Sequence, residues 1–118
     1  MDYTNREQVL DKVKRSALAL KKATLFQDDD EVVLTAVKAC GMAIEFASDR
    51  IKQTRRDIVE VAVSNFGRAI IRLPEYHNDF EMVALAYEND PDIIKYFKDN
   101  TVIMRQFNLY EYQKKIER

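Results

Sequence analysis

Residues 28–53 contain the pattern that decides the fold, and they read DDDEVVLTAVKACGMAIEFASDRIKQ. Apolar residues recur at intervals of three and four on both sides of Gly41, beginning at Val32 and ending at Ile51. Such spacing places apolar side chains along one face of a helix, whereas a strand would alternate apolar and polar residues. Because glycine permits a tight turn between two helices, the stretch predicts a helix, a turn at Cys40-Gly41 and a second helix.

The same pattern recurs along the chain. A polar residue followed three places later by an acid, a capping-box signal for a helix start, is found at Thr4–Glu7, Asp28–Glu31, Thr54–Asp57 and Asn78–Glu81. These starts are 24, 26 and 24 residues apart. A second set of breaks lies at Ser16, Cys40-Gly41, Phe66-Gly67 and Asp90-Pro91. The last of these predicts a helix start, with Asp90 as the N-cap and Pro91 in the first turn. We therefore predict tandem helix-turn-helix repeats, because stacked helical pairs bury a continuous core that one pair cannot form.

The predicted organisation is a single all-α domain over residues 1–118, either an α-hairpin bundle or a short solenoid. After Asn100 the pattern changes to one longer apolar-periodic stretch, as is common for the end unit of a repeat array. We expect it to be one helix with Val102, Ile103, Phe107, Tyr110 and Ile116 facing inward. The predicted segments are four helical pairs and a C-terminal capping helix, at residues 4–27, 28–53, 54–77, 78–99 and 101–116.

Composition excludes several broad classes of protein. The 118 residues contain 19 Lys and Arg and 20 Asp and Glu, so the formal net charge of −1 argues against a pervasively basic nucleic-acid binder. An apolar share of 47% argues against wholesale disorder. One cysteine cannot form an internal disulfide, and no signal peptide or membrane-spanning stretch is evident, so we expect a cytoplasmic protein without a membrane partner.

The second predicted unit resembles a known family. Its residues Asp30-Glu31-Val32-Val33-Leu34, Ala36-Val37, Gly41, Ala43-Ile44 and Phe46-Ala47-Ser48 are similar to the helical repeat catalogued as domain of unknown function 4116. The resemblance is close over residues 28–73 and weaker over 4–98, and it departs from the pattern at Arg72 and Leu73. It implies an all-α tandem repeat, widespread in bacteria, protists and their viruses. It provides no catalytic residues.

Residues capable of catalysis are few and do not form a motif. His77 is the only histidine, and its polar surroundings predict an exposed loop residue. Cys40 ends an apolar stripe, which predicts a buried, unreactive thiol. The acidic run from Asp28 to Glu31 lacks calcium-loop spacing, and one histidine with one cysteine cannot form a zinc site alone. We therefore expect no enzyme, no metal and no cofactor, with a small enzyme as the remote alternative.

Charge and aromatic residues are distributed unevenly, and this predicts a binding surface in the second half. Residues 73–94 contain six acids and no Lys or Arg, and eight of the twelve aromatic residues lie at or after Tyr76. Tyr110 and Tyr112 cannot both face one core, because residues two apart on a helix point in different directions. The predicted partner-binding surface comprises Tyr76, Glu88, Asp90, Asp92, Tyr110 and Tyr112.

Basic residues gather in the first half and define an alternative. A nucleic-acid-binding repeat would use Lys12, Lys14, Arg15, Lys21, Lys22, Arg50, Lys52, Arg55 and Arg56. The leading hypothesis is instead a non-catalytic protein-interaction module, since complementary charge and exposed tyrosines suit a protein interface. Its small size suggests a stoichiometric inhibitor or adaptor of a larger protein, for instance a viral protein that blocks a host enzyme. The sequence leaves the partner's identity and the oligomeric state open.

Overall fold

The computed structural model describes residues 3–117, and in this range the chain is all-α, as predicted, without a β-strand. It contains seven α-helices and five short 3₁₀ helices, which are labelled η. In chain order they are α1 (Arg6–Val13), α2 (Leu18–Lys22), η1 (Thr24–Phe26), α3 (Asp30–Ala39), η2 (Gly41–Phe46), α4 (Asp49–Thr54), α5 (Arg56–Asn65), η3 (Gly67–Arg72), η4 (Pro74–Tyr76), α6 (Phe80–Asn89), η5 (Pro91–Phe97) and α7 (Thr101–Glu117).

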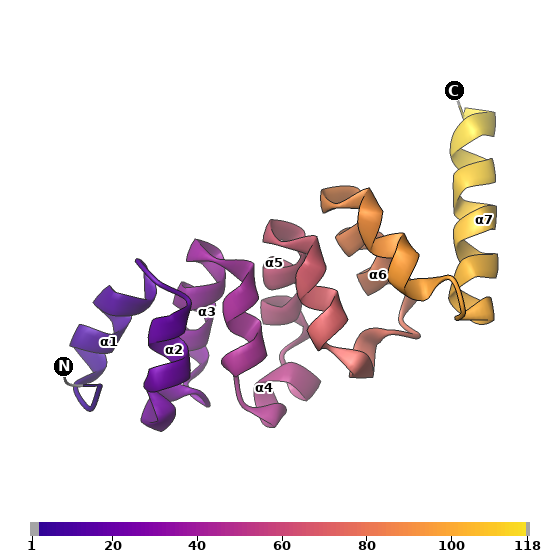
Figure 1. The fold of residues 1–118 in the computed structure, drawn as a ribbon. Helices are drawn as coiled ribbons and strands as arrows, with labels where there is room; N and C mark the ends of the chain where they lie inside the picture. The colour runs from indigo at the N-terminus through magenta and orange to yellow at the C-terminus, as the bar shows by residue number, and fades with distance from the viewer. Residues whose placement is uncertain (1–2, 118) are drawn as a thin grey trace.

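The helices form two layers in an elongated molecule of 53 × 25 × 21 Å (Figure 1). One layer contains α1, α3, α5 and α6, each packed on the next. The other contains α2, η2, η3 and η5, also packed in that order. Helix α7 follows α6 at the far end of the array, so the two ends of the described chain lie at opposite ends of the molecule (Figure 1).

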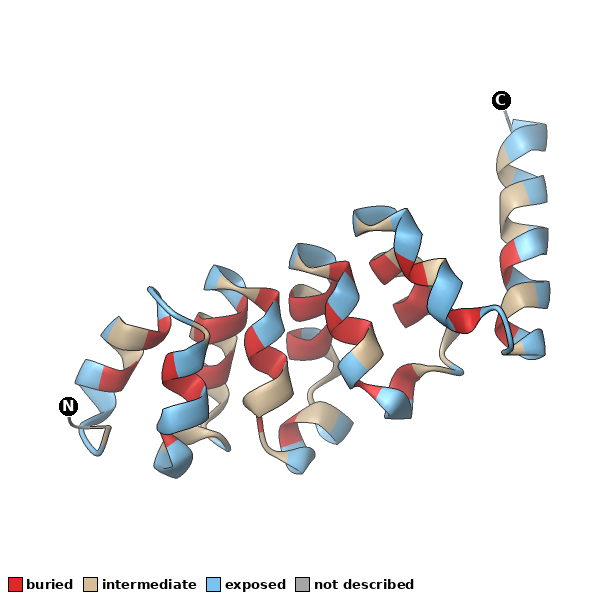
Figure 2. Ribbon diagram, in the orientation of Figure 1, coloured by how far each residue is buried: buried red, intermediate tan, exposed pale blue. Residues whose placement is uncertain are grey.

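The core lies between the two layers and extends along the whole array (Figure 2). Val32, Val33, Ala36 and Val37 of α3 are fully buried, as their spacing predicts. Helix α5 buries all four of the corresponding residues, whereas α6 buries three and leaves Tyr87 half-buried. The described helices include none that combines the length and hydropathy needed to cross a membrane.

The element that directly follows α3, α5 and α6 is a 3₁₀ helix rather than the α-helix that the apolar spacing suggested, whereas α1 is followed by the α-helix α2. Backbone bonds from Ala43 N–H to Cys40 O and from Ala47 N–H to Ile44 O join residues three apart. Side chains three apart eclipse in a 3₁₀ helix. This geometry aligns Gly41, Ile44 and Ala47 in one buried row, whereas the wider turn of an α-helix would spread them.

The two glycines lie at tight turns between helices, but they do not act through their backbone conformation. No residue among 3–117 has a positive φ, so neither Gly41 nor Gly67 supplies a left-handed turn. Both glycines instead allow close approach between neighbouring helices. A Cβ atom at Gly41 would collide with the backbone oxygen of Ala62, and one at Gly67 with that of Ala86. Glycine at these places therefore determines how tightly η2 packs on α5 and η3 on α6.

The helix caps lie one residue later than predicted. The predicted caps Thr4, Asp28 and Asn78 give way to the residues that follow them. The side chains that accept a backbone N–H at 3.1 Å are those of Asn5, Asp29 and Asp79. At the third position the prediction of Thr54 is also wrong, because Arg55 precedes α5 and makes no side-chain cap. Asp90 caps η5 in front of Pro91, as predicted, and accepts the Asp92 N–H.

Helix α7 spans almost the predicted residues, but part of its apolar surface faces solvent. Ile103 and Phe107 are buried against the array, as expected. Val102 and Ile116, which were also expected to face inward, are exposed. Leu18 and Leu25, near the other end, are exposed as well, because no neighbouring helix covers that end of the array within the described residues.

Candidate interaction surfaces

The N-terminal ends of four helices are joined by an arginine–aspartate ladder, which consists of the pairs Arg6–Asp29, Asp30–Arg55 and Arg56–Asp79. Arg6 Nε donates to Asp29 Oδ2 at 2.7 Å, Arg55 Nη1 donates to Asp30 Oδ2 at 2.6 Å, and Arg56 donates to Asp79. Each pair joins the first residue of one helix to the residue that precedes the next helix. The ladder therefore runs continuously from α1 to α6.

The ladder stabilises its carboxylates in the ionised form. Hydrogen bonds from Arg6 and Arg56 lower the pKa of Asp29 and Asp79, respectively, and this effect outweighs partial burial, which acts in the opposite direction. Asp29 and Asp79 also cap their own helices. Each of these side chains therefore fixes a helix start and a helix–helix junction together.

Three arginines of the predicted nucleic-acid-binding group are paired with acids of the same chain, in the ladder or beside it. Arg55 and Arg56 belong to the ladder, and Arg50 donates to Asp28 and Asp30 at 2.8 and 2.7 Å. These three guanidinium groups are neutralised within the chain. A phosphate would have to displace carboxylates to reach them, so the structure removes them from the freely available basic surface.

The other predicted basic residues lie mainly at the α1–α2 end. Lys12 lies over the Tyr3 ring, Arg15 is 3.5 Å from the Asp11 carboxylate, and Lys21 lies near the Phe46 ring. A hollow of about 480 Å³ gathers Lys12, Arg15 and Lys22 around Asp11. Lys14 is exposed just after the end of α1, whereas Lys52 is half-buried on α4. The basic group is therefore divided between the α1–α2 end, where three of its nine members share a hollow with Asp11, and the arginines that are paired with acids.

The predicted acidic and aromatic surface is also divided. Tyr76 is buried and its hydroxyl donates to the Lys52 carbonyl oxygen, so it holds η4 against α4 instead of facing a partner. Asp90 accepts from Arg68 Nε at 2.9 Å in addition to capping η5. Asp92 lies on η5, 3.8 Å from the Lys95 ammonium. Three of the six predicted residues therefore lie away from α7.

Glu88 and Tyr110 do come together. The Tyr110 hydroxyl donates to Glu88 Oε1 at 2.6 Å, and the Lys114 ammonium lies 4.5 Å from the centre of the Tyr110 ring. Tyr110 is half-buried and Tyr112 is 62% exposed, so the expectation that these two tyrosines face differently is confirmed. The shallow hollow around Glu88 and Tyr110 has a volume of about 420 Å³.

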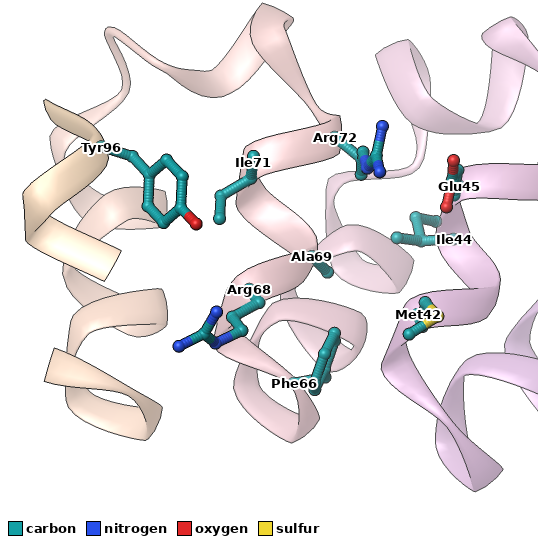
Figure 3. A pocket seen from close by; sticks show the side chains of 9 residues that line it. All are labelled: Met42, Ile44, Glu45, Phe66, Arg68, Ala69, Ile71, Arg72 and Tyr96. Atoms are coloured by element: carbon teal, nitrogen blue, oxygen red, sulfur yellow. The ribbon is translucent and has the colours of Figure 1, made fainter. Parts of the chain in front are cut away.

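A groove that the sequence did not predict lies on the 3₁₀ layer, across η2, η3 and η5 (Figure 3). Its volume is about 470 Å³. Met42 and Tyr96, which are 42% and 61% exposed, lie at its two sides, and Ile71 lies between them. The residues that line it are Met42, Ile44, Glu45, Phe66, Arg68, Ala69, Ile71, Arg72 and Tyr96.

Two arginines of η3 give the groove its charge. Arg68 is held by Asp90, which leaves it positioned but neutralised. Within residues 3–117, the side chain of Arg72 forms no ion pair or hydrogen bond, and the residue is exposed. Glu45 is the one carboxylate in the lining. The groove therefore combines exposed apolar side chains with an available cation.

The sequence contains a signal for this groove only in the regular spacing of its lining residues. Met42 and Arg68 are 26 residues apart, as are Glu45 and Ile71, and Arg72 and Tyr96 are 24 apart. These spacings match those between the predicted helix starts. Comparing equivalent outward positions of successive predicted units would have brought these residues together.

The predictions for His77 and Cys40 need correction. His77 is half-buried rather than exposed: its Nε2 lies 2.7 Å from the Ile70 carbonyl oxygen and its ring packs edge-on against Phe97. Since a carbonyl oxygen only accepts, Nε2 carries the proton. Gln27 makes the equivalent contact to Leu20 O.

Cys40 is half-buried rather than buried. The described residues contain no group of three or more metal-ligating side chains.

Comparison of the chain with curated proteins and with solved structures gives no significant match. A family model does match, over the segment from α1 to part of α4. This segment covers nearly all of the first and second predicted units, whereas the close resemblance in the sequence extended from the second unit into the third. The matching family is the one described as Domain of unknown function (DUF4116), over residues 5–52, and this confirms the family that the sequence resembles.

Proposed function

We propose that this chain is a non-catalytic protein-interaction module built from tandem helical pairs of about 25 residues. Contacts between equivalent positions support the repeat. Arg6–Asp29 and Arg56–Asp79 each join residues 23 apart. Gly41 and Gly67 each meet a carbonyl of the next long helix. In this arrangement α7 acts as the capping helix of the array.

The observation that supports protein binding best is the groove on the 3₁₀ layer. Exposed apolar side chains are individually ordinary, but a hollow that gathers several around a charged group is typical of a recognition surface. The lining of this groove contains no histidine, cysteine or serine. It therefore offers no pairing of a nucleophile with a histidine base, as many hydrolases use, and binding is the simpler function.

The proposed role is that of a stoichiometric inhibitor or adaptor of a larger protein in the cytoplasm, and a viral inhibitor of a host enzyme is one form of that role. Nucleic-acid binding is the weaker alternative, because Arg50, Arg55 and Arg56 are already paired with acids. The alternative predicts binding that weakens steeply with salt, since phosphate contacts release counterions. Removing nucleic acid with nuclease before capture separates the two hypotheses.

Site-specific photo-cross-linking tests the proposed function. A photoreactive phenylalanine analogue replaces Tyr96 in the groove, or Ser64, which is exposed on α5 in the other layer. After nuclease treatment of an extract from the native cells, we expect one protein to be cross-linked from position 96 and not from position 64. The substitution Met42→Asp should abolish this cross-link while circular dichroism stays unchanged. Equal labelling from both positions, or labelling that survives Met42→Asp, would reject the groove as the binding surface.

A further inference from the structure

We propose that the groove across η2, η3 and η5 binds a protein segment in which an acidic side chain lies beside a large apolar one. This inference rests on the proposed function and specifies the chemistry of its partner. The segment's carboxylate would bind at Arg72, and its apolar side chain would lie against Ile71 and either Met42 or Tyr96.

The charge of the groove determines the first part of this segment. Arg68 already shares its charge with Asp90 at 2.9 Å. Arg72 has no such partner in the described chain and lies on the same 3₁₀ helix, four residues later. A guanidinium group presents two parallel N–H donors that match a carboxylate. A carboxylate from a partner would therefore find one cation available and the other already occupied.

Glu45 limits where the acid of the partner can lie. It lines the groove on η2 and forms no ion pair with Arg72 or with any other residue among 3–117. A second carboxylate placed near η2 would be repelled by it. The groove therefore favours one acid at η3 rather than a run of acids along its length.

The apolar walls determine the second part. Met42 lies on the η2 side and Tyr96 on the η5 side, with Ile71 between them (Figure 3). Methionine adapts its shape to varied side chains. Tyrosine offers a large contact area at a small cost in side-chain entropy. A large aliphatic or aromatic residue next to the acid would therefore bury these exposed surfaces.

The same features disfavour other ligands. A nucleic-acid strand needs a track of cations for successive phosphates, whereas this groove has one unpaired arginine and two carboxylates, Glu45 and Asp90, in or beside it. An anionic membrane surface would meet the same carboxylates. A short protein segment can place one negative charge at Arg72 and avoid the acids.

Selection from a random peptide library displayed on phage tests the inference with the whole chain as target. We expect enrichment of peptides that contain Asp or Glu next to an aliphatic or aromatic residue. The charge reversal Arg72→Glu should replace the enriched acids by Lys or Arg. The matched control Arg105→Glu alters an exposed arginine on α7 and should leave the selected peptides unchanged.

Affinities of one selected peptide then measure each part of the groove. Arg72→Glu should weaken binding by about tenfold or more, because attraction becomes repulsion. Tyr96→Ala should weaken it several-fold, and Arg105→Glu should change it less than twofold. All three positions are exposed, so we expect every variant to fold, and circular dichroism checks this.

Two outcomes would overturn the inference. One is a failure to enrich acidic peptides, and the other is enrichment of the same acidic peptides by Arg72→Glu. In either case the proposed function is judged separately by the cross-link from position 96. A specific cross-link together with neutral or basic selected peptides would retain the protein-binding function and reject the acidic partner.

Discussion

The junctions between α1, α3, α5 and α6 differ in chemistry from the junction between α6 and α7. The first three are joined at their N-terminal ends by the arginine–aspartate ladder. At α6 the first residue is Phe80, in the place that Arg6, Asp30 and Arg56 occupy in the other helices. The Phe80 ring packs edge-on against Phe107 and Tyr110 of α7, with centroid distances of 5.2 and 5.6 Å.

The difference shows two ways of joining neighbouring helices. Charged pairs discriminate between neighbours, because two arginines or two aspartates facing each other repel. The alternation explains Arg55, which breaks the capping pattern: it faces Asp30, and an aspartate there would meet a like charge. Aromatic rings bury more surface but discriminate less by sign. The ladder therefore favours the observed neighbours by charge. The rings of Phe80, Phe107 and Tyr110, here called the aromatic cluster, join α7 to α6 through apolar contact.

Removing one ring of the aromatic cluster should have the largest of the predicted effects, and this effect should be confined to the junction between α6 and α7. Phe107→Ala deletes a buried ring and should cost about 3 to 5 kcal/mol in the docking of α7. Because α7 packs chiefly on α6, hydrogen exchange should show loss of protection in α7 while α3 keeps its own. Leu109→Ala, at a site that is 59% exposed, is the control. Equal loss of protection in α3 and α7 would mean that the two regions are not separable.

A new side chain at the close contact between Gly41 and Ala62 should lower the stability of the ladder region, meaning the helices α1, α3, α5 and α6, as a whole. Gly41→Ala places a Cβ against the backbone of Ala62, and overpacking of this kind costs about 2 to 3 kcal/mol. Urea unfolding measures the loss, with Met42→Ala as the neighbouring exposed control. A loss for Gly41→Ala no larger than that of the control would contradict the close-approach role of Gly41.

Reversing a ladder pair tests whether its sign specifies the junction. Arg56→Asp or Asp79→Arg alone should destabilise by about 1 to 2 kcal/mol, because like charges then face each other and, in the second case, a cap is lost. The double variant should recover part of this loss. It reproduces the orientation that Asp30 and Arg55 already have at the α3–α5 junction. A double-mutant cycle from urea unfolding with zero coupling would refute the role of charge.

Acid should weaken the ladder region through its carboxylates. The folded-state pKa values of Asp29 and Asp79 lie below their ordinary value. This stabilisation is therefore present above the unfolded pKa of about 3.9 and is lost as pH falls through the folded values. The free energy of unfolding should decrease between about pH 5 and about pH 2, and less steeply in Arg56→Met than in the wild type. Parallel pH profiles for the two proteins would contradict this.

The two tyrosines of α7 should give the smallest effects and the finest distinction. Tyr110→Phe removes the hydroxyl that binds Glu88 and should cost about 0.5 to 1 kcal/mol. Tyr112→Ala, at a 62% exposed site, should change stability by less than about 0.5 kcal/mol. Thermal unfolding compares them directly. A larger loss for Tyr112→Ala would show that the exposed face of α7 is covered in solution.

The sequence predicted the core of the fold well because apolar periodicity is local. Val32, Val33, Ala36 and Val37 lie within two turns of one helix, so their common face follows from helix geometry alone. The predicted cap positions were wrong by one residue because the local sequence does not choose between adjacent candidates. Several adjacent polar residues can cap a helix, and among the aspartates Asp29 takes this place while Asp28 binds Ser48 and Arg50.

The candidate site was less predictable than the fold. Tyr76 lies in a polar, acidic stretch of sequence that is typical of a surface tyrosine, yet its hydroxyl donates to the backbone carbonyl oxygen of Lys52, 24 residues earlier. The groove residues Met42, Arg72 and Tyr96 come from three separate 3₁₀ helices and have no common motif. Their individual residue types are ordinary, and only their positions in space make them a surface.

Local features therefore follow from the order of residues: helix content, the buried stripes and the Asp90-Pro91 start of η5. They depend on interactions within one or two turns, which the chain cannot avoid making. The tertiary structure alone determined which charges are paired, why two glycines are needed and where an unpaired arginine meets exposed apolar side chains. Those properties depend on distances between helices some 22 to 26 residues apart in sequence, which are established only when the two layers pack against each other.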